Sequence, residues 1–236
     1  MIFDPPVVKA TLIKRYKRFL ADVKLEDGTI ATAHCPNTGS MTSCWQEGDT
    51  VYLSPSTNPK RKLPFTWELS KTEGGYIGIN TSRPNAIVFE AIENGDIPSL
   101  KGYKSIRKEV KYGKNSRIDI FLEGHKTKPD CYVEVKNATL YDSERDIILF
   151  PDAKTERGQK HLVELEEMVS NGKRSVMFFL VNRPEGAHFE PAKDIDPKYT
   201  KLLKNAKESG VEVIAYRVNS TTKKMVIGEK VKVKIS

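Results

Sequence analysis

The chain has 236 residues, and its 39 Lys and Arg against 31 Asp and Glu give a formal net charge of +8. Apolar residues make up 38% and charged residues 30%, a mixture that builds a core but is too polar for a membrane protein. No apolar run approaches the roughly 20 residues of a membrane-spanning helix. Because residues 1–6 lack the basic and apolar regions of a signal peptide, we expect a cytoplasmic protein.

Residues 1–82 predict a β domain. Five short strands within about 80 residues are typical of a small closed barrel such as the OB-fold, a scaffold that often binds single strands and oligonucleotides. Turn residues such as Gly28 and Gly75 separate the β-branched and aromatic runs. The expected strands are 8–25, 29–34, 50–53, 65–69 and 76–79.

Residues 83–236 change to a mixed pattern of helices and strands. The order α-β-β-β-α-β-α-β predicts an α/β domain on a mixed sheet, and thus an α+β protein overall. The expected helices are 84–94, 156–170 and 199–209. The expected strands are 105–111, 117–122, 132–136, 174–181 and 211–218, followed by a basic hairpin or edge strand at 222–234.

The positive charge falls into four clusters, two in the barrel and two at 101–117 and 223–234. Each cluster alone is explained by a solvated surface, but four clusters and a net excess favour a nucleic-acid partner, because neutralised phosphates release counterions. The residues predicted to contact DNA in the barrel are Lys14, Arg15, Lys17, Arg18, Lys60, Arg61 and Lys62.

Two neighbouring strands of the second domain carry acidic and basic side chains. Alternation places Ile118 and Ile120 on one face of their strand and Asp119 on the other, and it places Glu134 and Lys136 together on one face of the next. In a hairpin, Asp119 would meet Glu134 and Lys136. Two carboxylates and an ammonium group suit phosphodiester hydrolysis, with oxygen ligands for Mg²⁺ or Mn²⁺ and a cation beside the attacking water.

The tripeptide Glu-Val-Lys is common enough to be a plain surface ion pair, and the chain contains a second copy at Glu109-Val110-Lys111. That copy has no acidic residue inside a preceding strand, whereas the copy at 134–136 follows Asp119 by 15 positions. The spacing therefore favours a site at Glu134 over a surface pair.

With Glu90 on a preceding helix and Arg157 and Lys160 on a following one, these residues resemble the PD-(D/E)XK nuclease core, although Ile118 stands where that motif has Pro. The chain from about residue 2 to 218 resembles the sugar fermentation stimulation protein A family. The matching stretches are 12–22, 34–41, 117–119, 132–137, 150–153, 155–162 and 210–213. The lysine-rich segment after Val218 lies outside the family pattern.

The resemblance implies an OB-fold at 1–82 joined to a nuclease-like domain at 83–236, in a protein that binds DNA without sequence preference. The family takes its name from a proposed regulatory role in sugar, notably maltose, metabolism. Two functions stay open: a Mg²⁺-dependent deoxyribonuclease, and a non-catalytic DNA-binding regulatory protein that keeps the nuclease scaffold. An RNA-binding protein with the same barrel is a weaker third.

The same resemblance assigns roles to single residues. Asp119 and Glu134 would bind the metal with the Val135 carbonyl, Lys136 would orient or deprotonate the water, and Glu90 would be an outer metal ligand. Another interpretation of Lys136 is that it only keeps the two carboxylates from repelling each other.

Arg157 and Lys160 would hold the scissile phosphate. An ion pair between Glu90 and Arg157 across their two helices is the alternative to their roles in the site. The turn at 36–40 has two interpretations. Its side chains at Asn37, Thr38 and Ser40 offer polar groups to a phosphate, or they hydrogen-bond their own backbone.

Overall fold

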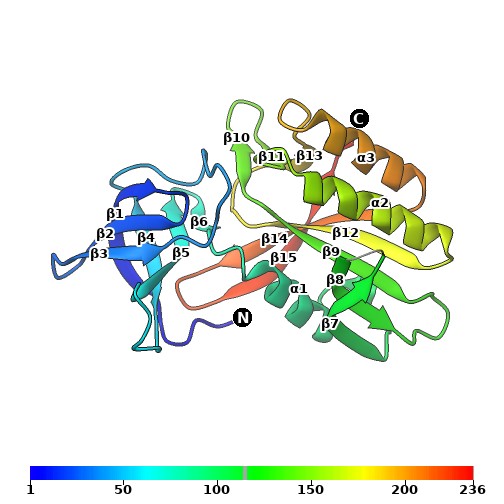
Figure 1. Cartoon of the computed structure of the whole chain (residues 1–236), viewed down its shortest axis with the longest axis horizontal. Coiled ribbons are helices and arrows are strands. Elements are labelled where there is room, and N and C mark those ends of the chain that lie inside the picture. The colour runs from blue at the N-terminus through cyan, green and yellow to red at the C-terminus, as the bar shows by residue number, and fades with distance from the viewer. Residues whose placement is uncertain (114–115, 236) are drawn as a thin grey trace.

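The computed structural model describes residues 1–113 and 116–235. It contains a β-barrel formed by the N-terminal part of the chain and, beside it, an α/β domain formed by the rest (Figure 1). Among the described residues, no helix is long and apolar enough to cross a membrane.

Five strands close the barrel, which confirms the predicted OB-like architecture. Neighbouring strands pair antiparallel in the order β3-β2-β1-β4-β5, and a parallel pairing of β3 with β5 closes the ring. The interior is filled by apolar side chains, among them the fully buried Leu12 and Trp67. The strands are β1 (Val8–Tyr16), β2 (Leu20–Leu25), β3 (Ile30–His34), β4 (Thr50–Pro55) and β5 (Phe65–Thr72).

The membership of the barrel differs from the prediction. The expected strand at 8–25 is two strands, joined by a turn in which Lys17 and Arg18 have φ of 48° and 65°. The three-residue turn at 17–19 uses this left-handed backbone, which Gly or Asn normally supplies, so Lys-Arg gave no turn signal. The last expected strand is β6 (Gly75–Gly78), which among the described strands pairs with β5 alone and lies outside the ring.

The α/β domain is built on a nine-stranded mixed sheet with the order β10-β11-β13-β15-β14-β12-β9-β8-β7. Its helices are α1 (Pro84–Glu93), η1 (Pro98–Leu100), α2 (Glu156–Ser170) and α3 (Pro197–Glu208). Its strands are β7 (Ser105–Tyr112), β8 (Ser116–Glu123), β9 (Cys131–Ala138), β10 (Leu140–Asp142), β11 (Ile147–Phe150), β12 (Arg174–Val181), β13 (His188–Pro191), β14 (Glu212–Ser220) and β15 (Met225–Val233).

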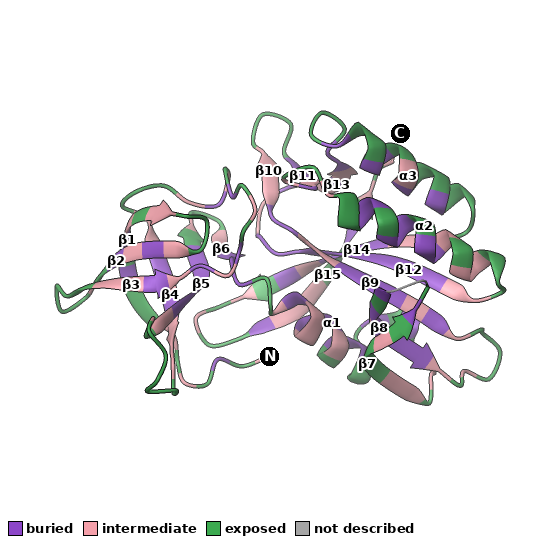
Figure 2. Ribbon diagram, in the orientation of Figure 1, coloured by how far each residue is buried: buried purple, intermediate pink, exposed green. Residues whose placement is uncertain are grey.

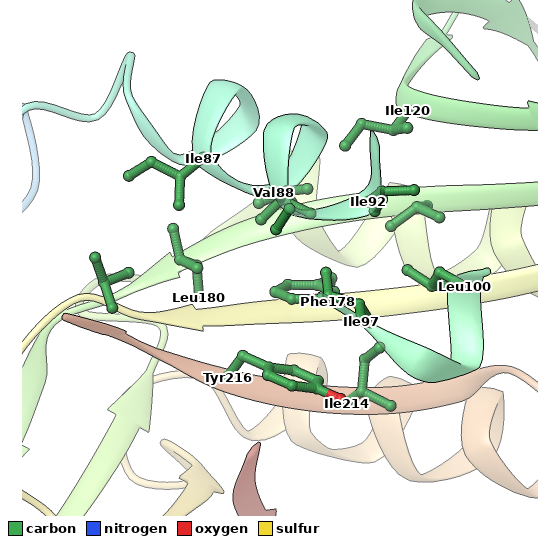
Figure 3. Packing of buried hydrophobic residues seen from close by; sticks show 14 of the residues in the cluster. Ile87, Val88, Ile92, Ile97, Leu100, Ile120, Phe178, Leu180, Ile214 and Tyr216 are labelled. Carbon is green, nitrogen blue, oxygen red and sulfur yellow. The ribbon is translucent and has the colours of Figure 1, made fainter. Parts of the chain in front are cut away.

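Helices cover both faces of the sheet, so its central strands are buried on both sides (Figure 2). On one face Ile87 and Val88 of α1 pack over Phe178 of β12 and Tyr216 of β14 (Figure 3). On the other face α2 and α3 bury a second cluster that includes Leu162. The near-continuous apolar sequence of β12 follows from this double burial.

Two parts of the sheet differ from the sequence prediction. The basic segment expected as a hairpin or edge strand is β15, which pairs antiparallel with β14 but also parallel with β13, so it lies inside the sheet. The short strands β10, β11 and β13 were not predicted, because three or four residues give too little periodicity to recognise.

Direct contacts join the two domains. The buried guanidinium of Arg183 donates to the carbonyls of Thr139 in the α/β domain, at 2.7 Å, and Ser43 in the barrel, at 3.2 Å. The backbone N–H of Gly78 donates to the Asn182 carbonyl at 2.9 Å. These bonds fix the barrel against the carboxyl ends of β9 and β12, and β9 carries part of the candidate site.

Candidate active site

The strands β8 and β9 separate next to Asp119, the first predicted carboxylate, and we call this point of separation the fork. The two strands pair from Leu122 to Ile120 of β8, whereas β9 goes on pairing with β12 as far as Ala138. Asp119 is the first β8 residue beyond the paired segment, and its Oδ2 accepts the backbone N–H of Val135 at 2.8 Å. The side chain thus replaces a backbone acceptor that the departing strand no longer offers.

The fork also corrects the predicted alternation. Ile120 belongs to the core on the α1 side of the sheet, as expected, but Ile118 belongs to the core beneath α2 and α3. The side-chain phase changes at Asp119 because β8 turns away from β9 there. Opposite Asp119 on β7, Glu109 has φ of 54°, a backbone conformation that few residues other than Gly adopt.

Asp119 is held by α1. Nδ2 of Asn85, in the first turn of that helix, donates to its Oδ1 at 2.8 Å. Burial and the nearby charge of Glu134 raise the pKa of Asp119 to about 6, although the bonds from Val135 and Asn85 act in the opposite direction. The ionised carboxylate is therefore under electrostatic strain that a cation would relieve.

Glu134 lies deeper, with only 2% of its surface exposed. Its Oε1 accepts from Nζ of Lys136 at 2.6 Å and contacts Nδ1 of His161 on α2, while its Oε2 is buried without a protein partner. Burial raises the pKa of Glu134, but the bonds and charges of His161 and Lys136 outweigh it, so the pKa is lowered overall. A buried ionised oxygen without a partner is costly and suits a bound cation.

Glu90 is not brought to this cluster. Its carboxylate pairs with the α-amino group of Met1 at 2.6 Å, and 48% of the side chain is exposed. The α1 residue that does contact Asp119 is Asn85. Among the described residues, no three His, Cys, Asp or Glu side chains are grouped as a ready metal site, so the predicted three-carboxylate ligand set does not form.

The two basic residues of α2 lie on its exposed surface near the carboxylates. Nε of Arg157 is 3.5 Å from Nε2 of His161, which links Arg157 to Glu134. Nζ of Lys160 donates to Oγ of Ser116 at 3.1 Å and pairs with Glu164 at 3.4 Å. Glu90 pairs elsewhere, so the alternative Glu90–Arg157 ion pair is wrong.

The turn at 36–40 is held to its own backbone and to the α/β domain. Oδ1 of Asn37 accepts the N–H of Gly39 at 2.9 Å, and Oγ of Ser40 donates to the Asp152 carbonyl at 3.1 Å. Asn37 is buried, while Thr38 remains exposed. The structural interpretation therefore holds for Asn37.

Arg15 braces the same turn rather than facing solvent. Its guanidinium NH2 donates to the carbonyls of Arg18, Asn37 and Gly39 at 2.9 to 3.0 Å. These bonds link the β1–β2 turn to the turn at 36–40 and engage one of the three guanidinium nitrogens. The structure thus gives Arg15 a role in barrel structure.

The other predicted barrel cations remain accessible. Lys14 is 3.4 Å from Asp22, and Nη2 of Arg61 donates to Thr66 at 2.8 Å, so these two are partly engaged. All of Lys14, Lys17, Arg18, Lys60, Arg61 and Lys62 are exposed. Whether they contact DNA stays a prediction.

Sequence reasoning did not identify Asn85 or Glu164 and left His161 without an assigned role. Asn85 gave no signal because a single Asn at a helix start is ordinary capping chemistry. His161 and Glu164 lie three positions apart on one face of α2, and Arg157 lies one turn before His161. That spacing, on a helix with one apolar stripe, was the available signal for a polar face turned toward the site.

A family model described as "Sugar fermentation stimulation protein RE domain" matches residues 82–224, and one described as "SfsA N-terminal OB domain" matches residues 13–79. A sugar fermentation stimulation protein homolog of Geobacter sulfurreducens is 53% identical over 99% of this chain and 98% of its own length. The homolog of Geobacter metallireducens is 55% identical over 99% of both chains.

One solved structure matches nearly the whole chain. The structure of Pyrococcus furiosus SfsA in complex with Ca²⁺ has a TM-score of 0.87 and 28% sequence identity, covering 98% of this chain and 96% of its own. The predicted resemblance and the predicted fold, an OB barrel with a nuclease-like α/β domain, are confirmed.

Proposed function

Since the chain belongs to the sugar fermentation stimulation protein family, we propose that it binds DNA without sequence preference and cleaves its phosphodiester bonds with Mg²⁺ or Mn²⁺. The observation that carries the proposal is the fork between β8 and β9. There Asp119 and Lys136 lie beside the buried Glu134, whose Oε2 has no protein partner.

The donor atoms at the fork fit a hard divalent cation. Mg²⁺ takes oxygen ligands and is commonly held by one or two carboxylates together with water and phosphate. Asp119 and the unpartnered oxygen of Glu134 supply such carboxylates, and the raised pKa of Asp119 supports a cation beside them. The Ca²⁺ named for the Pyrococcus furiosus relative supports divalent-cation binding in this family.

Three residues around the two carboxylates have separate roles in the proposed hydrolysis. Lys136 lies beside Glu134, where its ammonium group can orient a water for attack on phosphorus and stabilise negative charge in the transition state. His161 fixes Glu134 from the α2 side, and Asn85 fixes Asp119 from the α1 side. A bound Mg²⁺ would polarise the phosphate and lower the pKa of a coordinated water.

The remaining cations would bind the nucleic acid. Arg157 is exposed next to His161, within reach of a phosphate that enters the cluster. Lys17 and Arg18 are exposed on the β1–β2 turn, which Arg15 ties to the turn at 36–40. Because that turn contacts Asp152 just before α2, the barrel cations and the fork belong to one connected part of the molecule.

The test of cleavage uses purified protein with single-stranded, duplex and branched DNA, in Mg²⁺, Mn²⁺ or EDTA. We expect cleavage only with metal, and its loss in Glu134→Gln. Glu109→Gln is the matched control, because Glu109 begins the same tripeptide on exposed β7 and should leave the rate unchanged. Cleavage that survives Glu134→Gln or EDTA would refute the assigned site.

The test of binding measures affinity for DNA by fluorescence anisotropy across salt concentrations in EDTA. About five phosphate contacts predict a slope of log affinity against log salt of roughly −4 to −5. Lys17→Ala with Arg18→Ala should make this slope less negative, whereas Arg15→Ala should mainly lower the thermal stability of the barrel. Binding without any cleavage would instead favour the non-catalytic regulatory protein, and a slope near zero would refute the electrostatic account.

A further inference from the structure

A groove of about 390 Å³ lies between the N-terminal halves of α2 and α3. Three of its lining residues are lysines: Lys154 just before α2, Lys160 on α2, and Lys198 in the first turn of α3. Glu156 is the one acidic side chain among the residues that line it. The two helices lie side by side on one face of the sheet, with their outer surfaces exposed (Figures 1 and 2).

The position of Lys160 is fixed by partners beneath it. Oε1 of Glu164 pairs with its Nζ at 3.4 Å and also accepts the Ser116 hydroxyl at 2.9 Å, and Glu164 is only 5% exposed. The ammonium group of Lys160 is therefore anchored by a buried carboxylate rather than free to move over the surface. An anchored cation loses less side-chain entropy when it meets an anion.

The other two groove lysines have their charge available. Lys154 and Lys198 are exposed, and neither forms an ion pair with any residue in 1–113 or 116–235. The buried Asp196 is the N-cap of α3, where it accepts the backbone N–H of Tyr199, and it also accepts the N–H of Thr155, whose hydroxyl caps α2 by accepting the N–H of Gly158. With those donors satisfied internally, the groove would hold an anion through its lysine side chains.

Lys160 connects the groove with the strand that carries Asp119. Lys160 lines the groove and also reaches Ser116, three residues before Asp119 on β8. Arg157, one turn earlier on α2 than His161, continues the line of cations to Glu134. Exposed basic side chains are thus found from Arg157, which contacts Glu134 through His161, across α2 to the first turn of α3.

We propose that this groove binds backbone phosphates of the same nucleic-acid strand whose scissile phosphate occupies the fork. The inference rests on the proposed function and adds the track that the strand follows beyond the reacting bond. Lysine ammonium groups act as point charges on phosphate and read no base sequence, so the groove contributes affinity and register without sequence preference.

The experiment compares two double variants in the full-length protein by fluorescence anisotropy with labelled DNA in EDTA. Lys154→Ala with Lys198→Ala removes the two free groove charges. Lys204→Ala with Lys207→Ala is the matched control, because it removes the same net charge from exposed positions further along α3. On duplex DNA we expect the groove variant to make the slope of log affinity against log salt less negative by about 2. The control variant should keep the wild-type slope within experimental error.

A charge-preserving variant, Lys154→Arg with Lys198→Arg, should retain the wild-type slope. Equal effects of the groove and control variants, or no effect of either on a wild-type protein that binds DNA, would overturn the groove while leaving the proposed function intact. A wild-type protein that binds no DNA would overturn the proposed function itself. Thermal melting of each variant shows whether any loss reflects unfolding instead.

Discussion

The tripeptide Glu-Val-Lys occurs twice in this protein, on strands that are separated in the sheet only by β8. On β7, Glu109 and Lys111 are exposed. On β9, Glu134 is almost fully buried, and Lys136 and His161 contact one of its oxygens. The same three residues thus form a solvated surface in one place and the centre of a candidate active site in the other.

The difference comes from the position of each strand. β7 is the edge of the nine-stranded sheet, whereas β9 pairs with β12 along its length and lies beneath α2. Exclusion of water strengthens the interaction between charges and makes an ionised oxygen without a partner unfavourable in free energy. A bound cation would therefore stabilise the buried copy but not the exposed one. A motif this short acquires chemistry from its burial and its neighbours.

The largest expected effect is on the rate of DNA cleavage, and it distinguishes Lys136 from Lys111. Lys136→Met should lower the rate of metal-dependent DNA cleavage by about 10² to 10⁴, because it removes the positioned cation beside the attacking water. Lys111→Met should leave the rate unchanged. Single-turnover assays with saturating Mg²⁺ measure both, and a similar rate for the two variants would mean that the copies do not differ in function.

The second effect concerns the pH dependence of stability in the metal-free protein. Asp119 has a pKa of about 6 in the folded state against 3.8 ordinarily, so folding favours its protonated form. Its contribution to stability is therefore present at low pH and lost as the pH rises from about 4 to 6, by up to about 3 kcal/mol.

Urea unfolding in EDTA at pH 4 to 7 measures this loss. Asp119→Asn should abolish that part of the pH dependence, and saturating Mg²⁺ should offset it in the wild type, since the cation favours the ionised carboxylate. Identical pH profiles for wild type and Asp119→Asn would show that Asp119 is not under electrostatic strain.

The third effect tests whether Asn85, which orients Asp119, supports metal binding from α1 in place of Glu90, the outer ligand that the resemblance implied. Asn85→Ala should weaken Mg²⁺ binding by about 10- to 100-fold, because it removes the hydrogen bond from the Asn85 amide that orients the Asp119 carboxylate. Isothermal titration with Mg²⁺ gives the affinity. Glu90→Gln is the control, and a larger loss from Glu90→Gln than from Asn85→Ala would reverse this assignment.

The smallest effect is at Glu109 itself. Its φ of 54° lies in the left-handed region, so Glu109→Gly should raise the free energy of unfolding, by about 1 kcal/mol at most. Thermal melting measures the shift. Glu134→Gly in the buried copy should instead destabilise the fold, and a destabilising Glu109→Gly would mean that the Glu109 side chain makes contacts that matter for stability.

Much of the architecture followed from the local sequence. The bounds of α2 and β12 match their apolar patterns, because an amphipathic helix and a fully buried strand have strong periodicity. The β1–β2 turn did not follow, because Lys17 and Arg18 adopt a conformation for which their side chains give no preference. β10, β11 and β13 are stabilised by pairing with distant parts of the chain, which no local pattern encodes.

The sequence by itself determined the family, the two kinds of domain, and the residues Asp119, Glu134 and Lys136 as a group. The tertiary structure decided which other side chains join them. The fork at Asp119, the choice of Asn85 over Glu90 and the approach of His161 all depend on how helices pack across strands far apart in sequence. Alternation along a strand fixes the face on which a side chain lies, but only packing fixes its neighbours.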